Sequence, residues 1–278
     1  MDTTLDVRAA AVAGIFYPRE SGELSRFIQA MFADAAGASP WLRPPKALIV
    51  PHAGYIYSGP IAASAYAPLN RLRGIIQRVV LLGPAHHMPV SGLALPGASA
   101  FDTPLGRVRV DEAAVDLLRP LTMVTTNPAA HAREHSIEVQ LPFLQQALGT
   151  FQLVPLAVGQ ASAAAVAEVV ETLWGGLETL IVVSSDLSHY LPYERAQEMD
   201  RHTCASISGL NPLASHEQAC GATAVNGLLL AARQHRLTPH LMDLRNSGDT
   251  AGDHDRVVGY AAFALTQEGA HDPSPLDH

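Results

Sequence analysis

Short runs of consecutive apolar residues recur along this chain, and stretches that favour helices lie between them. Continuous apolarity is typical of strands that are covered on both faces of a sheet. It predicts strands at 46–51, 78–84, 91–96, 151–159, 179–186, 238–247 and 256–265. Helices are predicted at 21–35, 60–68, 111–119, 137–148, 161–174, 192–208 and 220–235. Strands that alternate with helices predict an α/β fold with helices on both faces of the sheet.

The alternation continues without a break or an internal repeat, which predicts a single domain over residues 1–278. The Pro-rich segment 39–45 is interpreted as a connection between the first helix and the first strand. The polar segment 268–278 is interpreted as a frayed tail.

Composition narrows the classes of function. Hydrophobic residues make up 48% of the chain and charged residues 16%, which predicts a sizeable core. The net charge of -8 argues against nucleic acid and anionic membrane surfaces as partners, because both attract basic patches. No apolar run reaches membrane-spanning length, and the first residues lack the basic region of a secretion signal. With only 2 cysteines, we expect a reducing, cytoplasmic location.

Three of the predicted strands end in residues that could perform chemistry. If these strands are parallel neighbours, their carboxyl ends open on one edge of the sheet and form one cleft. Imidazole is a common metal ligand and general base, so this convergence favours a site over three separate strand-end caps. Adjacent residues on an extended chain point in opposite directions, so only one of the two adjacent histidines should face the cleft. The residues are His52, His86 with His87, and Asp186 with His189.

Two further segments carry candidate groups. Cys220 precedes an apolar helix, whose N-terminus would favour a reactive or metal-binding thiolate. A small buried packing residue is an equally good interpretation of Cys220, and it is the one we favour for Cys204. Glu134 and His135 precede an amphipathic helix with Ser136 as a candidate N-cap, and we expect them to line a pocket.

These motifs resemble, in order, those of the Memo-like family, known in prokaryotes as AmmeMemoRadiSam system protein B. The resemblance covers about residues 8–265 and rests on AVAGIFYP, PHAGYIYSG, LLGPAHH, TPLG, EHSIEVQLPFLQ, SSDLSHY and ACG. It implies a fold similar to the LigB-type class III extradiol dioxygenases, which is one α/β domain with a central mixed sheet. In those enzymes two histidines and a carboxylate hold Fe(II), and a further histidine acts as acid and base.

The resemblance implies roles for individual residues. By motif position, His52 and His86 look like two metal ligands, and Cys220 falls where the third ligand is expected. His189 looks like the acid/base histidine, with Asp186 orienting it. A thiolate in place of a carboxylate softens the site, so we expect Fe(II) or copper, with zinc as a further option. The surrounding residues expected to contact substrate are Tyr55, His87, Glu134 and His135.

Two classes of function follow. The first is a redox or dioxygenase-related metalloenzyme that acts on an unidentified small molecule or peptide. The second is a non-catalytic binding or adaptor protein with a vestigial metal cleft, which works with radical SAM and AMMECR-type proteins. A hydrolase that uses Cys220 and His189 is a third option, although the chain has no local signature for one.

Overall fold

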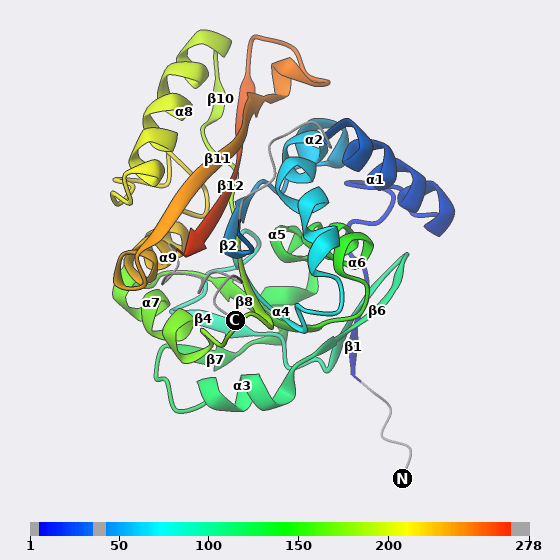
Figure 1. The fold of residues 1–278 in the computed structure, drawn as a ribbon, viewed down its shortest axis with the longest axis vertical. Coiled ribbons are helices and arrows are strands. Elements are labelled where there is room, and N and C mark those ends of the chain that lie inside the picture. Colours follow the sequence, from blue (N-terminus) through cyan, green and yellow to red (C-terminus); the bar gives the residue numbers. More distant parts are fainter. Residues whose placement is uncertain (1–5, 36–42, 268–278) are drawn as a thin grey trace, which may run out of the picture.

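The computed structural model describes residues 6–35 and 43–267, and it shows an α/β fold built on one large mixed sheet (Figure 1). The main path of the sheet runs β1-β5-β6-β8-β3-β9-β2-β12-β10. β11 extends it by pairing with β12, and β4 pairs with β7 and β8. The strands are β1 (Val7–Arg8), β2 (Pro45–Val50), β3 (Arg78–Pro84), β4 (Leu93–Leu95), β5 (Ala100–Thr103), β6 (Gly106–Val110), β7 (Val124–Thr126), β8 (Gln152–Val158), β9 (Thr179–Ser184), β10 (His189–Leu191), β11 (Leu237–Asn246) and β12 (Val257–Gln267).

The helices cover both faces of this sheet, as the alternating pattern predicts. In Figure 1, α1 and α2 lie to one side of the strands, and α7, α8 and α9 lie to the other. The α-helices are α1 (Ser21–Ala35), α2 (Tyr55–Tyr66), α3 (Glu112–Leu118), α4 (Pro128–Ala132), α5 (His135–Glu138), α6 (Gln140–Leu148), α7 (Ala163–Thr172), α8 (Tyr193–Ser208) and α9 (Ala222–Gln234). Two short 3₁₀ helices are η1 (Ala67–Leu72) and η2 (Ser247–Asp249).

The continuous apolar runs arise because successive residues of the central strands enter two different cores. In β3, Val79 and Leu81 pack in the core with α1, α2 and α6. Val80 and Leu82 pack in the opposite core with α3, α7, α8 and α9. Every second side chain of a strand points to the same face, so a sheet covered on both faces needs apolar residues at every position.

The four central strands β8, β3, β9 and β2 are parallel neighbours. β12 then pairs with β2 in antiparallel orientation, which makes the sheet mixed. The register aligns Leu82 of β3 with Val183 of β9, and Val50 of β2 with Ser184 of β9. The carboxyl ends of β2, β3 and β9 therefore lie side by side at one edge.

Each of the seven predicted strands has a counterpart, and the differences concern short or irregular segments. The sequence pattern misses β1, β5, β6, β7 and β10, which have between 2 and 5 residues and are too short to show a clear apolar run. The helix predicted at 60–68 begins earlier, at Tyr55, with Pro60 inside it. The helix predicted at 137–148 is split into α5 and α6.

Other expectations are met or fall outside the described part of the chain. Cys204 is 4% exposed and packs in the core with α7 and α9, which confirms its packing role. Within residues 6–35 and 43–267, no helix combines the length and apolarity that a membrane span requires. The predicted tail at 268–278 and residues 39–42 of the predicted connection lie outside the described residues.

Candidate metal centre

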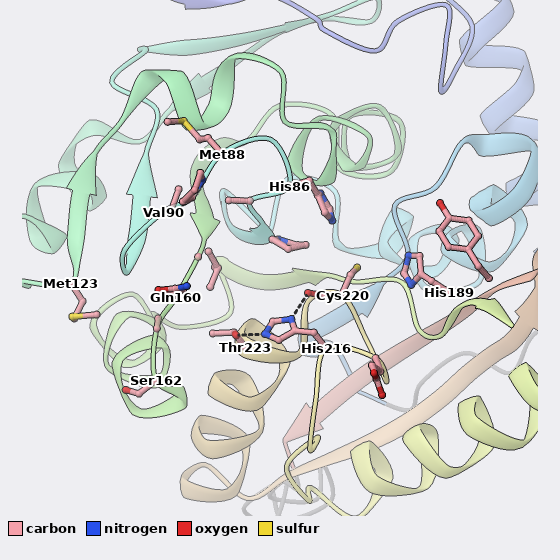
Figure 2. A pocket seen from close by; sticks show the side chains of 18 of the residues that line it. His86, Met88, Val90, Met123, Gln160, Ser162, His189, His216, Cys220 and Thr223 are labelled. Atoms are coloured by element: carbon pink, nitrogen blue, oxygen red, sulfur yellow. Dashed lines mark hydrogen bonds between the residues drawn. The ribbon is translucent and has the colours of Figure 1, made fainter.

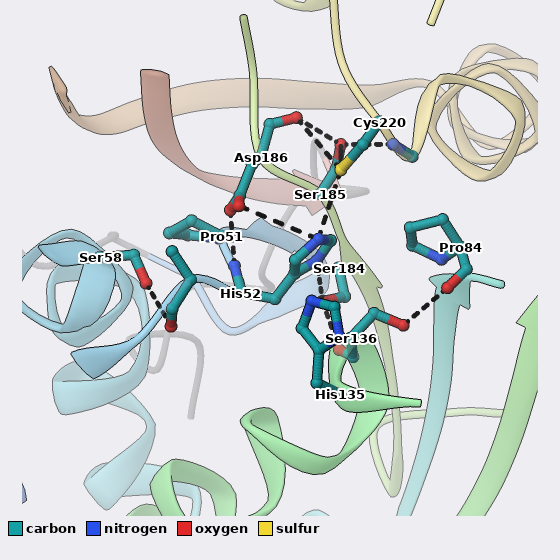
Figure 3. A network of polar contacts seen from close by, with 12 residues as sticks. Pro51, His52, Ser58, Pro84, His135, Ser136, Ser184, Ser185, Asp186 and Cys220 are labelled. Atoms are coloured by element: carbon teal, nitrogen blue, oxygen red, sulfur yellow. Dashed lines mark hydrogen bonds and ion pairs between the residues drawn. The ribbon is translucent and has the colours of Figure 1, made fainter. Parts of the chain in front are cut away.

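Three strand ends and one distant loop meet at the carboxyl edge of the sheet. His52 follows β2, His86 follows β3, and the segment from Ser185 to His189 follows β9. Because these strands are parallel neighbours, the predicted convergence on one edge is confirmed. Cys220 reaches the same point from the loop between α8 and α9 (Figures 2 and 3).

His52, His86 and Cys220 form a compact set of donors. Their ligand atoms all lie within 4.8 Å of one another. The Sγ atom of Cys220 lies 3.3 Å from Nε2 of His52. Two donors bonded to one ion, at bond lengths of about 2.0 to 2.3 Å and angles between roughly 90° and 109°, are about 3.1 to 3.6 Å apart. The separation therefore fits two ligands of the same metal ion.

A buried network fixes the proton of His52 on the side away from Cys220. Nδ1 of His52 lies 2.9 Å from Oγ of Ser184, and this hydroxyl donates its own proton to the carbonyl of Ser136 at 2.6 Å (Figure 3). The Ser184 oxygen also accepts from Nε2 of Gln140 at 2.8 Å. Because Ser184 donates elsewhere, it accepts from His52, so Nδ1 carries the hydrogen and Nε2 keeps its lone pair.

Burial keeps the His52 ring neutral. The residue is 2% exposed. This burial, followed by the neighbouring His86 and His135, lowers the pKa of His52 well below its usual value. A neutral imidazole with a free Nε2 is the form that binds metals.

Glu134 performs the corresponding task for His86. It accepts from the backbone N–H of His86 at 2.6 Å and from Nδ1 of the same residue at 2.9 Å. A third hydrogen bond comes from the N–H of Ser136 at 2.9 Å. Burial alone would raise the pKa of Glu134, but the hydrogen bonds from His86 and Ser136 outweigh it and hold that pKa well below its usual range. The carboxylate thus leaves Nε2 as the free nitrogen of His86.

These contacts change two expectations. Glu134 is 1% exposed and its carboxylate engages His86, which argues against the expected contact with substrate. Ser136 is not the N-cap of the helix, because Glu134 occupies that position in α5. Glu134, His86 and His135 also present ligand atoms within 4.8 Å of one another. The Glu134 carboxylate already accepts three hydrogen bonds, however, which favours a supporting role over a second metal site.

Asp186 and His189 are both present, but Asp186 does not orient His189. Nδ1 of His189 lies 2.9 Å from the carbonyl of Leu187, which fixes its hydrogen and leaves Nε2 free. Oδ1 of Asp186 instead accepts from the backbone N–H of His52 at 2.7 Å, and its Oδ2 lies 3.9 Å from Nε2 of His52. Burial raises the pKa of Asp186 to about 6, although the hydrogen bond from His52 and the charge of His189 oppose the rise.

Cys220 is held by the segment that follows β9. Its N–H donates to the carbonyl of Asp186 at 3.2 Å, and the N–H of Gly221 donates to Oγ of Ser185 at 2.9 Å. A Cβ at Gly221 would lie 2.7 Å from Cβ of Ser185, so only glycine allows this close approach. The expected lowering of the thiol pKa is not found: burial, followed by the charge of Asp186, raises the pKa of Cys220 to about 12. The thiol therefore needs a bound cation to lose its proton near pH 7.

The remaining predicted residues lie in three different settings. The ring of His135 stacks on that of His86 with centroids 4.7 Å apart, and burial lowers its pKa to about 4. His87 is exposed and touches His135 edge-on at 5.9 Å, so it supports the wall beside the donors. Tyr55 is 2% exposed, donates to the carbonyl of Val139 at 2.6 Å and packs on Phe143 in the core. This placement argues against the expected contact between Tyr55 and substrate.

A cavity of about 1310 Å³ opens beside the donors, and His86, His189 and Cys220 lie on its wall (Figure 2). His216 also lies on this wall, with Nδ1 3.0 Å from the carbonyl of Cys220 and Nε2 3.2 Å from Oγ of Thr223. Our sequence reasoning missed His216, Ser184 and Gln140. Only their closeness in the chain to Cys220, Asp186 and Glu134 hinted at a role.

Comparison with known proteins agrees with the motifs. The family model described as Memo-like protein matches residues 8–264. A MEMO1 family protein of Methanopyrus kandleri is 35% identical, with 93% of this chain and 98% of the relative covered. One from Ignicoccus hospitalis is 36% identical (92% and 97% covered), and one from Aquifex aeolicus is 35% identical (91% and 97% covered). An uncharacterized Escherichia coli K12 protein of solved structure aligns with a TM-score of 0.49 at 15% identity, covering 79% of this chain and 99% of that one. On the family match and these relatives, the chain belongs to the Memo-like protein family.

Proposed function

We propose that this protein binds a metal ion through His52, His86 and Cys220 and uses it in redox or dioxygenase-related chemistry on a substrate held in the cavity. The observation that carries the proposal is the arrangement of the two histidines. Each has its Nδ1 hydrogen engaged, by Ser184 or by Glu134, so that Nε2 is free on the side of Cys220. Histidines that only cap strand ends have no need of such supporting acceptors.

The donor set fits a soft or borderline ion. Two imidazoles and one thiolate suit copper or zinc, and iron is also compatible with such donors. A bound ion would polarise a substrate group or exchange electrons with it. We favour Fe(II) or copper over zinc because the family resemblance points to redox chemistry.

His189 supplies the proton transfer in this proposal. Its Nε2 is free, because Nδ1 engages the carbonyl of Leu187, and the residue lies on the cavity wall with His86 and Cys220. An imidazole so placed can take a proton from a bound substrate and return it. Asp186 acts through its hydrogen bond to the backbone of His52 and so stabilises the ligand loop.

The alternative, a binding or adaptor protein, shares the metal donors but gives His189 no task. The contact between thiol and imidazole also bears on the hydrolase option. Cys220 lies 3.3 Å from Nε2 of His52, which the metal proposal needs as a ligand, and no described contact joins Cys220 to His189. Association with radical SAM and AMMECR-type proteins remains a prediction from the resemblance.

The test is metal analysis of untagged protein purified without oxygen, followed by titration with Co(II), whose spectrum reports thiolate coordination. We expect about one equivalent of bound metal and a sulfur-to-cobalt band in the near ultraviolet. Both should be lost in His86→Ala and kept in the matched variant His87→Ala. The band should also be lost in Cys220→Ser and kept in Cys204→Ser.

His189 gives the second half of the test. His189→Gln should retain the metal, because the proposal places this residue outside the coordination sphere. Equal loss of metal in His87→Ala and His86→Ala, or a wild type that binds no added Fe(II), Cu(I) or Zn(II), would contradict the proposal. Loss of metal in His189→Gln would contradict its acid/base assignment alone.

A further inference from the structure

Half of the 20 described residues that line the cavity have apolar side chains, and most of the others carry uncharged polar groups or imidazoles. The apolar side chains of this wall come from five parts of the chain, namely the end of β3 with the loop after it, the segment between α3 and β7, the end of β8 with the loop after it, β10 and α8. They include three methionines, whose flexible thioethers adapt to irregular apolar shapes. Figure 2 shows Met88, Val90 and Met123 on the side of the cavity away from His189. Six of the apolar lining residues are Met88, Val90, Met123, Val158, Leu191 and Met199.

Permanent charge on this wall is sparse and of one sign, and the lining groups that can become cationic are the histidines His86, His189 and His216. Among the described residues that line the cavity there is no lysine or arginine, and Glu217 is the one carboxylate. The nearby guanidinium of Arg256 lies 5.0 Å from the ring centroid of Tyr190, with which it interacts, and Arg256 is not part of the described lining. An anion in the apolar part of the cavity would lose hydration without gaining a cationic partner, which is costly.

Tyr190 marks the wall beside His189. It has a φ of 58°, a left-handed conformation that is unfavourable for a residue with a side chain. It is nevertheless 61% exposed, so burial of its ring does not offset this cost. The strain lies at the register shift between His189 and Leu191 where β10 pairs with β12, and irregularities of this kind concentrate at functional sites.

From these three observations we propose that the cavity binds an uncharged, predominantly aliphatic small molecule and disfavours anionic ones. Tyr190 would cover the alkyl part of the bound molecule. The inference deepens the proposed function, since the reacting end of such a molecule would lie near His189 and the metal ligands. The methionine-rich wall holds the aliphatic part, and Glu217 adds repulsion toward anions.

A matched series of probes tests this directly: 1-octanol, octanoate and octylammonium share one chain and differ in charge. Binding is followed by NMR of protein labelled with [methyl-¹³C]methionine, first after removal of metal with a chelator and then with Zn(II) added. We expect 1-octanol to shift the signals of Met88, Met123 and Met199, which line the cavity, and to leave those of Met31 and Met242, which are not part of the described lining, unchanged. Octanoate should bind the metal-free protein at least tenfold more weakly than 1-octanol.

Variants identify the wall residues responsible. Tyr190→Ala should weaken 1-octanol binding about fivefold, whereas Tyr193→Ala, whose ring stacks on His254 and is not part of the described lining, should not. Met199→Lys should strengthen octanoate binding about tenfold and leave 1-octanol binding no stronger than in the wild type, because it supplies the missing cation.

Three outcomes would overturn the inference: equal or tighter binding of octanoate to the metal-free protein, 1-octanol shifts confined to Met31 or Met242, or no response to 1-octanol up to its solubility. Metal binding is measured separately with Co(II). A protein that binds 1-octanol in the cavity but no metal would contradict the proposed function and support this inference. A protein that binds metal but not 1-octanol would contradict this inference and leave the proposed function supported.

Discussion

Replacing Glu134 by glutamine should weaken metal binding without removing a ligand. The carboxylate accepts three hydrogen bonds, from the backbone N–H of His86 at 2.6 Å, from its Nδ1 at 2.9 Å and from the N–H of Ser136 at 2.9 Å. Glutamine has only one acceptor oxygen. In one orientation its NH₂ group faces the backbone N–H of His86, and in the other it faces Nδ1 and Ser136.

Either orientation has a cost that can be estimated. An amide hydrogen facing Nδ1 favours the tautomer of His86 that carries its proton on Nε2, where the metal needs a lone pair. Loss of such a supporting acceptor lowers metal affinity about 10- to 100-fold, which is about 1.4 to 2.7 kcal/mol. The unpaired buried N–H group should also reduce the free energy of unfolding by about 1 to 3 kcal/mol.

The assay is competition for Zn(II) against a chromophoric chelator, with urea unfolding in parallel. Glu171→Gln is the matched control, because Glu171 also accepts from a histidine, His235 at 2.9 Å, but at a half-exposed site outside the donor cluster. It should bind Zn(II) like the wild type. Unchanged affinity in Glu134→Gln would refute the supporting role. A loss beyond about 1000-fold would show that Glu134 is itself a ligand, as the alternative donor group would allow.

Three other changes test the fold and the donor set. Arg8→Met leaves Glu138, 0% exposed, without its ionic partner and should cost about 3 to 5 kcal/mol in urea unfolding, with part of the loss recovered by adding Glu138→Gln. Burial lowers the pKa of His131 to about 4, so only the unfolded chain binds this proton between that pH and about 6.5. The free energy of unfolding should therefore decrease as the pH is lowered through this window, and His131 should account for a decrease of about 2 kcal/mol between pH 7 and pH 5. The variant His131→Gln should lack this contribution in urea unfolding at the two pH values. Cys220→Asp should weaken the binding of Cu(I) and Zn(II) relative to that of Fe(II), because it replaces a soft donor by a hard one. Competitive metal titration measures this change in preference, and an unchanged preference would show that Cys220 is not a ligand.

The strand-end reasoning succeeded where local pattern and topology agree. Parallel strands with both faces covered show their apolar character in the sequence, and the residues that follow them must lie at one edge. His52, His86 and His189 could be placed in this way. The position of Tyr55 could not be inferred in this way. It lies in α2 with its ring packed in the core against Phe143, and its place next to a histidine in the sequence motif does not reveal the direction of its side chain.

The sequence by itself therefore determined the α/β class, the main strands and the histidines at their ends, because these depend on local periodicity and on chain breaks after each strand. Tertiary structure alone decided which strands are neighbours, that Cys220 joins them 168 residues away from His52, and that Glu134 and Ser184 fix the proton positions of the two histidines. Those features depend on hydrogen bonds and packing between segments far apart in the chain. Such contacts leave no periodic signal in the sequence of either partner.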